Sequence, residues 1–242
     1  MAKITVRNAS TAEDDVTFIV AAFDSTLAPL AALGSGAMWG STLFSQKDGF
    51  VEETVKDVRM SERYQATGEA EEALRIFVAE VELEDGTEAG AGLRCREAGD
   101  GRRYLPVGMA MVREGWVPGH VKNQFHVEKI REELEGRKDF VYVDVLISDF
   151  RTGGLRKGAG EALLGWTGKH AVEKGMRGVY LDAWAGNGGG LVRYYEKHGS
   201  YEKRKAEAQY HPDLVAYEGC TGTQPKVDVI RGEDYRMRKQ PA

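Results

Sequence analysis

One stretch of the chain combines glycines, basic side chains and the start of a helix in a way that suits an anionic ligand. It reads Leu155-Arg156-Lys157-Gly158-Ala159-Gly160-Glu161-Ala162-Leu163-Leu164, and it follows a strongly β-prone segment. Glycines let the backbone approach a ligand closely, and the first amides of a helix point outward without partners inside the helix. Phosphate is the natural ligand for that geometry, and Arg151 adds charge nearby. A tight strand-to-helix turn with a solvated basic pair explains the same residues equally well.

Two carboxylates stand inside apolar segments that are typical of strands. Asp144 lies within Phe140–Ile147, and Asp182 lies within Val179–Trp184. Burying a carboxylate without a partner is costly, so each is either paired with a buried Arg or Tyr or lines a wet pocket. In the second case the carboxylate is a candidate base, which takes a proton from an incoming ammonium directly or through water.

Aromatic residues mark two further places where a substrate could be held. Trp39 lies within the glycine-rich loop at 34–40, where its ring could form a flat wall for an organic molecule or a cation. The same ring could instead plug the end of the core. The segment 114–138 is longer than a simple hairpin. Its Trp116, His120 and Phe125 could make it a lid, although surface decoration is the equal alternative.

Composition and charge exclude several classes of protein. The chain has 242 residues, with 33 Lys and Arg against 38 Asp and Glu, giving a net charge of −5. That balance argues against a nucleic-acid partner and suits a cationic small molecule slightly better than an anionic one. The longest apolar run, Phe18–Phe23, is far short of a membrane span. The histidines and the two cysteines, Cys95 and Cys220, form no metal-binding spacing, so we expect no metal.

We expect a cytoplasmic protein. The opening residues carry no apolar segment of the signal-peptide kind. The two cysteines are then free thiols in a reducing compartment.

The elements that must position these residues alternate between strands and helices. The predicted strands are Lys3–Arg7, Leu74–Leu83, Leu105–Val112, Phe140–Ile147, Val179–Trp184, Tyr201–Gln209 and Val227–Met237. The predicted helices run from a capping box at Ser10 to Pro29, from near Asp48 to about residue 60, over Phe125–Leu134, from Gly158 to Gly175, and over Leu191–His198. Residues 61–73 should connect, and 84–103 should form an exposed loop. This mixture predicts one α/β domain over residues 1–242.

The second half of the chain resembles the GNAT acyltransferase family, whose members bind acetyl-coenzyme A. The family's loop, Arg-Gly-x-Gly-x-Gly/Ala followed by a helix rich in Ala and Leu, is similar to Leu155–Gly160 and its continuation. The family's next strand ends near an Asn and is followed by a helix with Tyr-Glu-Lys-x-Gly-Phe. Leu181–Asn187 and Tyr194–Gly199 are similar to that pair. The opening strand, the two early helices and Val107–Ala110 fit the family's order.

The chain departs from the family pattern at several positions. Leu155 stands where the loop usually has Arg or Gln, with Arg156 one place later and Thr152–Gly154 as extra residues before it. Arg151 could instead be the family's arginine. The Phe after the late Gly is replaced, and the spacing from Asn187 to the tyrosines is one residue longer. None of these changes removes the backbone amides, which hold the pyrophosphate.

The resemblance implies a GNAT-like fold and an N-acetyltransferase activity. The fold would have a mixed central sheet splayed between two parallel strands, with helices on both faces. The enzyme would transfer an acetyl group from acetyl-coenzyme A to a primary amine of a small molecule, by direct attack in a ternary complex. A GNAT-fold sensor that binds acyl-coenzyme A without catalysis and an acetyltransferase of protein amines are the alternatives. A homodimer is left open.

The resemblance also assigns roles to particular residues. Tyr195 would protonate the departing thiolate, and Asp144 would be the base, while Tyr194 is read as a core residue. Trp39, Asp182 and Trp184 would contact the acceptor. The coenzyme would contact Leu146, Ile147, Arg151, Leu155, Arg156, Lys157, Gly158, Ala159, Gly160, Glu161, Asn187 and Tyr195.

Overall fold

The computed structural model describes residues 3–36, 38–69, 71–84, 86–87, 89–184, 186–198, 214–215 and 227–232. Its strands are β1 Ile4–Asn8, β2 Leu74–Leu83, β3 Arg96–Glu97, β4 Arg103–Glu114, β5 Phe140–Ser148, β6 Gly178–Trp184, β7 Leu214–Val215 and β8 Val227–Gly232. Its α-helices are α1 Asp15–Ala32, α2 Phe50–Thr67, α3 Gly119–Lys122, α4 Glu128–Leu134, α5 Ala159–Glu173 and α6 Gly186–His198. The 3-10 helices are η1 Thr11–Glu13, η2 Phe44–Gln46 and η3 Phe150–Arg156.

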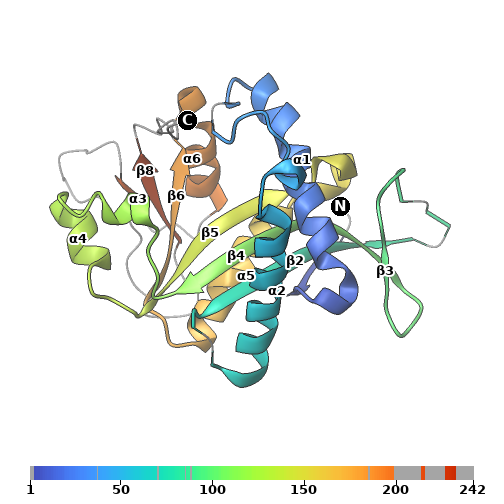
Figure 1. Cartoon of the computed structure of the whole chain (residues 1–242), viewed down its shortest axis with the longest axis horizontal. Helices are drawn as coiled ribbons and strands as arrows, with labels where there is room; N and C mark the ends of the chain where they lie inside the picture. The colour runs from blue at the N-terminus through green and yellow to red at the C-terminus, as the bar shows by residue number, and fades with distance from the viewer. Residues whose placement is uncertain are drawn as a thin grey trace.

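The strands form one open, mixed sheet, which confirms the predicted α/β class. Their order across the sheet is β1-β2-β4-β5-β6-β8-β7, with β3 paired to β4 (Figure 1). The pairs on either side of β6, with β5 and with β8, are parallel, whereas β1, β2, β4 and β5 follow one another antiparallel. Strand β5 therefore lies where the antiparallel part of the sheet meets the parallel part.

Helices cover both faces of the sheet. One face packs on α5 and α6, where Leu163, Leu164 and Val192 join Val141 and Val179 in one core. The other face packs on α1 and α2, which lie in front of the sheet in Figure 1. The segment from 115 to 138 adds a third apolar cluster over β5 and β6. The residues around β3 project from the body as an extended arm (Figure 1).

The first helix differs from its prediction at both ends. Ser10 caps the short helix η1 instead, with its Oγ accepting from the amide of Ala12 at 3.1 Å, and α1 begins only at Asp15. Pro29 does not end α1. A proline lacks only its own backbone donor, and its carbonyl oxygen still accepts from Leu33 N at 3.1 Å, which completes the last turn.

By length and apolar composition, α1 is the one helix in the described part of the chain that could cross a membrane. In the structure, Ile19, Ala22 and Phe23 of this helix are buried. They pack against Val58 of α2 and Ile76 of β2.

The second helix is longer than predicted, since residues 61–67 continue it instead of connecting. Its buried positions include Val58, Ser61 and Tyr64. Ser61 Oγ accepts from the amide of Ile76 at 2.9 Å, and the Tyr64 hydroxyl donates to Glu114 at 2.6 Å. Polar side chains with buried partners hide the periodicity that an apolar stripe would reveal.

Most of the remaining predicted elements match the structure closely, but α6 begins at Gly186, before the predicted Leu191, and the predicted loop at 84–103 contains the short strand β3. Strand β2 has the predicted bounds, β5 and β6 extend theirs by one residue at one end, and β4 extends its own by two residues at each end. The predicted helix at 125–134 is realised as α4, and Gly175, with φ of +67°, ends α5 as predicted. Of the two predicted late strands, β8 matches the first part of Val227–Met237, whereas Tyr201–Gln209 lies outside the described residues.

Candidate functional site

The two central parallel strands are paired along only part of their length. Residues Phe140–Val143 of β5 pair with Gly178–Leu181 of β6. Beyond that point Asp144–Ser148 runs beside β4, and Asp182–Trp184 runs beside β8. We call these two diverging strand ends the fork; in Figure 1 the labelled ends of β5 and β6 point in different directions.

The fork begins at a β-bulge. Met111 of β4 faces Val145, and the next residue, Val112, faces Val143, so Asp144 is the extra residue of β5. A bulge changes which face of the sheet the following side chains occupy. Before it, Val143 packs in the core under α5, and after it Ile147 packs in the core under α1 and α2.

The bulged Asp144 is paired with an arginine. Arg113 Nε lies 3.0 Å from Asp144 Oδ2, and the same guanidinium also contacts Glu72. Asp144 keeps a quarter of its side chain exposed. Of the two outcomes expected for a carboxylate in an apolar strand, Asp144 thus shows pairing and also partial access.

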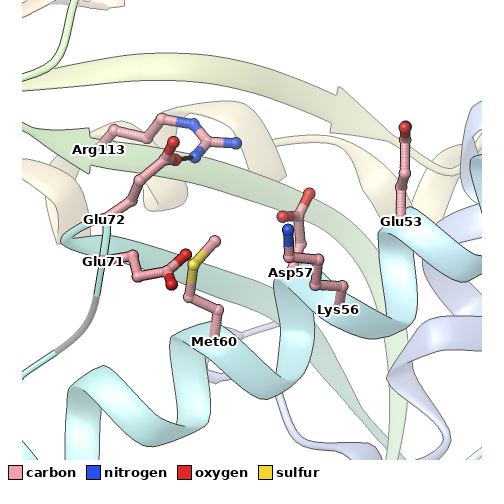
Figure 2. A pocket seen from close by; sticks show the side chains of 7 residues that line it. All are labelled: Glu53, Lys56, Asp57, Met60, Glu71, Glu72 and Arg113. Atoms are coloured by element: carbon pink, nitrogen blue, oxygen red, sulfur yellow. Dashed lines mark hydrogen bonds and ion pairs between the residues drawn. The ribbon is translucent and has the colours of Figure 1, made fainter.

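An acidic hollow adjoins this ion pair (Figure 2). It has a volume of about 390 Å³ and lies between α2 and the neighbouring ends of β2 and β4. Four carboxylates and two cations line it together with one methionine: Glu53, Asp57, Glu71, Glu72, Lys56, Arg113 and Met60. Burial raises the pKa of Asp57, and the charge of Asp144 raises it further against the opposing effect of Arg113. The hollow therefore suits a cationic group.

The second fork carboxylate, Asp182, is held on both oxygens. The Tyr142 hydroxyl donates to Oδ1, and His120 Nε2 lies 3.2 Å from Oδ2. The hydrogen bond with Asp182 raises the pKa of His120 above its usual value, with burial opposing the change. The Trp116 ring lies edge-on to Tyr142 at 5.9 Å, so the segment 114–138 covers this side of the fork.

The turn that leads into α5 carries Gly158 and Gly160, and we call it the glycine turn. It lies beside the outer end of β5. Gly158 precedes α5 with φ of +92°, a left-handed conformation that favours glycine. A Cβ added at Gly108 of β4 would lie 2.8 Å from Ile147 O and 3.3 Å from the Cβ of Ala159, so Gly108 lets α5 begin against this strand end. The first bond inside the helix runs from Ala162 N to Gly158 O, which leaves the preceding amides directed out of the helix end.

The two arginines near this turn have different surroundings. Arg151 Nη2 lies 2.6 Å from Asp149 Oδ2, and Asp149 is fully buried. Arg151 therefore neutralises a buried carboxylate just after β5. The Arg156 guanidinium lies 3.9 Å from the centre of the Phe150 ring, and its Nη1 lies 3.4 Å from Ser148 Oγ. Within the described part of the chain, Arg156 Nε is buried without a hydrogen-bond partner. Arg156 is therefore the better placed of the two to meet an anion. Leu155 and Lys157 are exposed.

The two tyrosines of α6 lie in different places. Tyr195 is 6% exposed and belongs to the core under α5 and α6. Burial raises the pKa of its hydroxyl well above the usual value, and the charge of Asp182 at the fork raises it further. The Tyr194 hydroxyl instead lies against Gly160, where an added Cβ would overlap it. Sequence reasoning gave Tyr194 only a packing role and did not place it at the glycine turn.

The other predicted site residues do not gather at the hollow. Trp39 packs among aromatic rings, with its centroid 5.5 Å from those of both Phe23 and Phe44, and it does not line the hollow. Leu146 packs toward α5. The side chains of Trp184 and Asn187 lie outside the described residues.

Sequence reasoning did not single out Arg113, Asp57 or Glu72. Their roles depend on the bulge and on the placement of α2, which no local pattern reveals. Among the residues that the structure describes, no group of three or more His, Cys, Asp or Glu side chains is placed to hold a metal ion.

No family model matches the chain, and no curated protein matches it.

Proposed function

We propose that this protein transfers an acetyl group from acetyl-coenzyme A to a primary amine of a small molecule, on a GNAT-like fold. The observation that carries the proposal is the fork, where β5 and β6 lose their pairing after Val143 and Leu181. In the family that the sequence resembles, the coenzyme enters between two such parallel strands. The order of strands, with the glycine turn directly after the diverging strand, supports the same assignment.

The outer half of β5 offers its backbone to the coenzyme. Val145–Ser148 is paired with β4 on one side and has no strand partner on the side of β6 among the described residues. The pantetheine arm carries amide groups, and it would pair with this edge as an added strand does. The amides of Leu146 and Ile147 would then lie near the thioester oxygen, where donors stabilise the developing oxyanion.

The start of α5 would receive the pyrophosphate. The amides from Gly158 to Glu161 supply donors at a positive helix end. Arg156, stacked on Phe150 beside Ser148, supplies a cation at the same strand end. Tyr194 places its hydroxyl against Gly160, so it would contact the coenzyme at this end.

The acceptor would reach the thioester from the side of α2. The acidic hollow lies on that side, and its Arg113 is paired with Asp144 of the fork (Figure 2). The amine attacks the thioester carbon directly once both molecules are aligned. Tyr195, whose hydroxyl lies in the field of Asp182, would give a proton to the departing thiolate.

A screen of amines tests this function. The protein is incubated with acetyl-coenzyme A and a diamine, a triamine, an amino sugar or an arylalkylamine, and free thiol and acetylated product are measured. We expect amine-dependent thiol release matched by acetylated amine. Coenzyme binding without transfer to any amine would favour the sensor, and transfer only to protein lysines would favour the protein acetyltransferase.

The acceptor side is tested by one variant and a matched control. Asp57→Asn removes a carboxylate from the hollow and should raise the KM for the amine about tenfold, the ~1.4 kcal/mol expected for one charged contact. The KM for acetyl-coenzyme A should stay unchanged. Glu52→Gln removes a carboxylate from the same helix at an exposed position outside the hollow, and it should change neither constant.

A further inference from the structure

We propose that His120, oriented by Asp182, is the base that removes a proton from the ammonium of the acceptor. This inference rests on the proposed acetyl transfer and assigns a catalytic residue that sequence reasoning placed only in a lid. Of the three histidines whose side chains the structure describes, His120 alone contacts a fork residue. His126 is exposed, with its Nδ1 3.2 Å from Asn123 O, and His170 contacts Glu114.

The contacts of Asp182 fix the imidazole. Its Oδ1 accepts from the Tyr142 hydroxyl, which leaves Oδ2 for His120 Nε2 at 3.2 Å. A carboxylate oxygen accepts only, so a neutral imidazole that bonds to it through Nε2 carries its hydrogen there and keeps Nδ1 as the basic nitrogen. His120 keeps 39% of its side chain exposed, so the ring can be reached from solvent.

The other fork carboxylate is less suited to be the base. Asp144 is paired with Arg113 at 3.0 Å, and a carboxylate beside a guanidinium is stabilised as the anion. A general base works best when its pKa lies near the working pH, which favours an imidazole over such a carboxylate. Asp144 then fits a different task, which is to attract the cationic acceptor toward the fork.

The groups that face His120 raise its affinity for a proton. Asp182 on β6 acts most strongly, through the hydrogen bond and its charge, and the charge of Asp144 on β5 adds to it. The Tyr142 hydroxyl donates to the other oxygen of Asp182. Arg113 pairs with Asp144, and its guanidinium lies 5.0 Å from the centre of the Trp116 ring. A raised pKa brings the imidazole closer to neutrality, where it exchanges a proton readily.

The proposed proton balance is complete without a further reactant. His120 Nδ1 takes one proton from the ammonium and later gives it to solvent. The amine nitrogen forms a bond to the thioester carbon, and the carbon–sulfur bond breaks. The thiolate takes a proton from Tyr195, and the tyrosinate recovers one from the nitrogen. The products are the amide, coenzyme A and one proton.

The test combines a pH profile with the titration of one side chain. The rate kcat/KM is measured against pH with acetyl-coenzyme A and the best amine of the screen, and the His120 ring is titrated by NMR in the same protein. In the wild-type protein the acidic limb of the profile should follow the His120 pKa. Asp182→Asn should move the limb and the NMR titration together to lower pH. His120→Gln should remove the limb and lower kcat by ~10²-fold or more.

His126→Gln is the matched control, because it changes an exposed histidine of the same segment and should leave the profile unchanged. The proposal is overturned if His120→Gln keeps the limb, or if Asp182→Asn moves the NMR titration without moving the limb; acetyl transfer itself then stands. A wild-type protein that acetylates no amine of the panel overturns the proposed function and this assignment together. Asp182→Asn keeps the test decisive should His120→Gln not fold.

Discussion

The hydroxyl of Tyr194 on α6 occupies the space that a Cβ at Gly160, in the first turn of α5, would need. Glycine at this position is therefore required by a neighbouring side chain as well as by any ligand. A bulky residue there would displace Tyr194 whether or not the coenzyme binds, so loss of coenzyme binding alone cannot locate the pyrophosphate at Gly160.

A double-mutant cycle measures this contact. Gly160→Ala gains up to ~1 kcal/mol of helix preference, but the overlap with Tyr194 should cost ~1–3 kcal/mol. We expect a net loss of unfolding free energy of about 1 kcal/mol in the wild-type background and none in the Tyr194→Phe background. Urea unfolding of the four proteins gives both values.

Gly165→Ala is the control on the same helix, because a Cβ there meets nothing within 4 Å. It should raise the unfolding free energy by up to ~1 kcal/mol. Equal unfolding free energies of Gly160→Ala and Gly165→Ala would show that the Tyr194 hydroxyl leaves room for a Cβ at position 160.

The adjacent tyrosines should separate catalysis from binding. Tyr195→Phe removes the proposed proton donor and should lower kcat by ~10²-fold with little effect on coenzyme affinity. Tyr194→Phe removes a hydroxyl at the glycine turn and should weaken coenzyme binding about fivefold, the ~1 kcal/mol of one hydrogen bond. Steady-state kinetics and coenzyme titration of both variants check this. The reversed pattern would exchange the two roles.

Acid should weaken the fold through Glu114. Burial alone would raise the pKa of this carboxyl, but hydrogen bonds with His170 and Tyr64 and the charge of Lys174 outweigh burial and lower it. A lowered pKa in the folded state means that the stability is present above the unfolded value of about 4.5 and is lost as the pH falls through the folded pKa.

The measurement is the unfolding free energy between pH 7 and pH 3, for the wild type and Glu114→Gln. The variant should lose ~3–5 kcal/mol at pH 7, because it leaves buried partners unpaired. The difference between the two proteins should shrink below about pH 4.5. A difference that is constant with pH would show that Glu114 contributes no pH-dependent stability.

The fold was predictable wherever local sequence pattern decided it. Strand β2 shows clear alternation, and Gly175 stands where a helix end favours glycine, so both were predicted correctly. The end of α2 was missed because Ser61 and Tyr64, both polar, are buried with partners in distant elements.

The candidate site was predictable only in part. The glycine turn is contiguous in sequence, so its position at a helix start could be inferred. The pair of His120 and Asp182 joins distant segments, and the bulge at Asp144 depends on the register of β4 and β5. Such relationships follow from tertiary placement, which residue spacing does not encode.

Calorimetric titration with coenzyme A is the most direct test of the central assignment, an acyl-coenzyme A site at the start of α5. We expect the wild type to bind with a Kd in the range of about 1 μM to 1 mM, as enzymes commonly bind their substrates. Arg156→Glu should weaken binding at least ~10-fold through the lost phosphate contact. Lys169→Glu, the same reversal near the far end of α5, should leave the Kd within about twofold. Failure of the wild type to bind coenzyme A, or equal effects of the two reversals in folded proteins, would contradict the assignment.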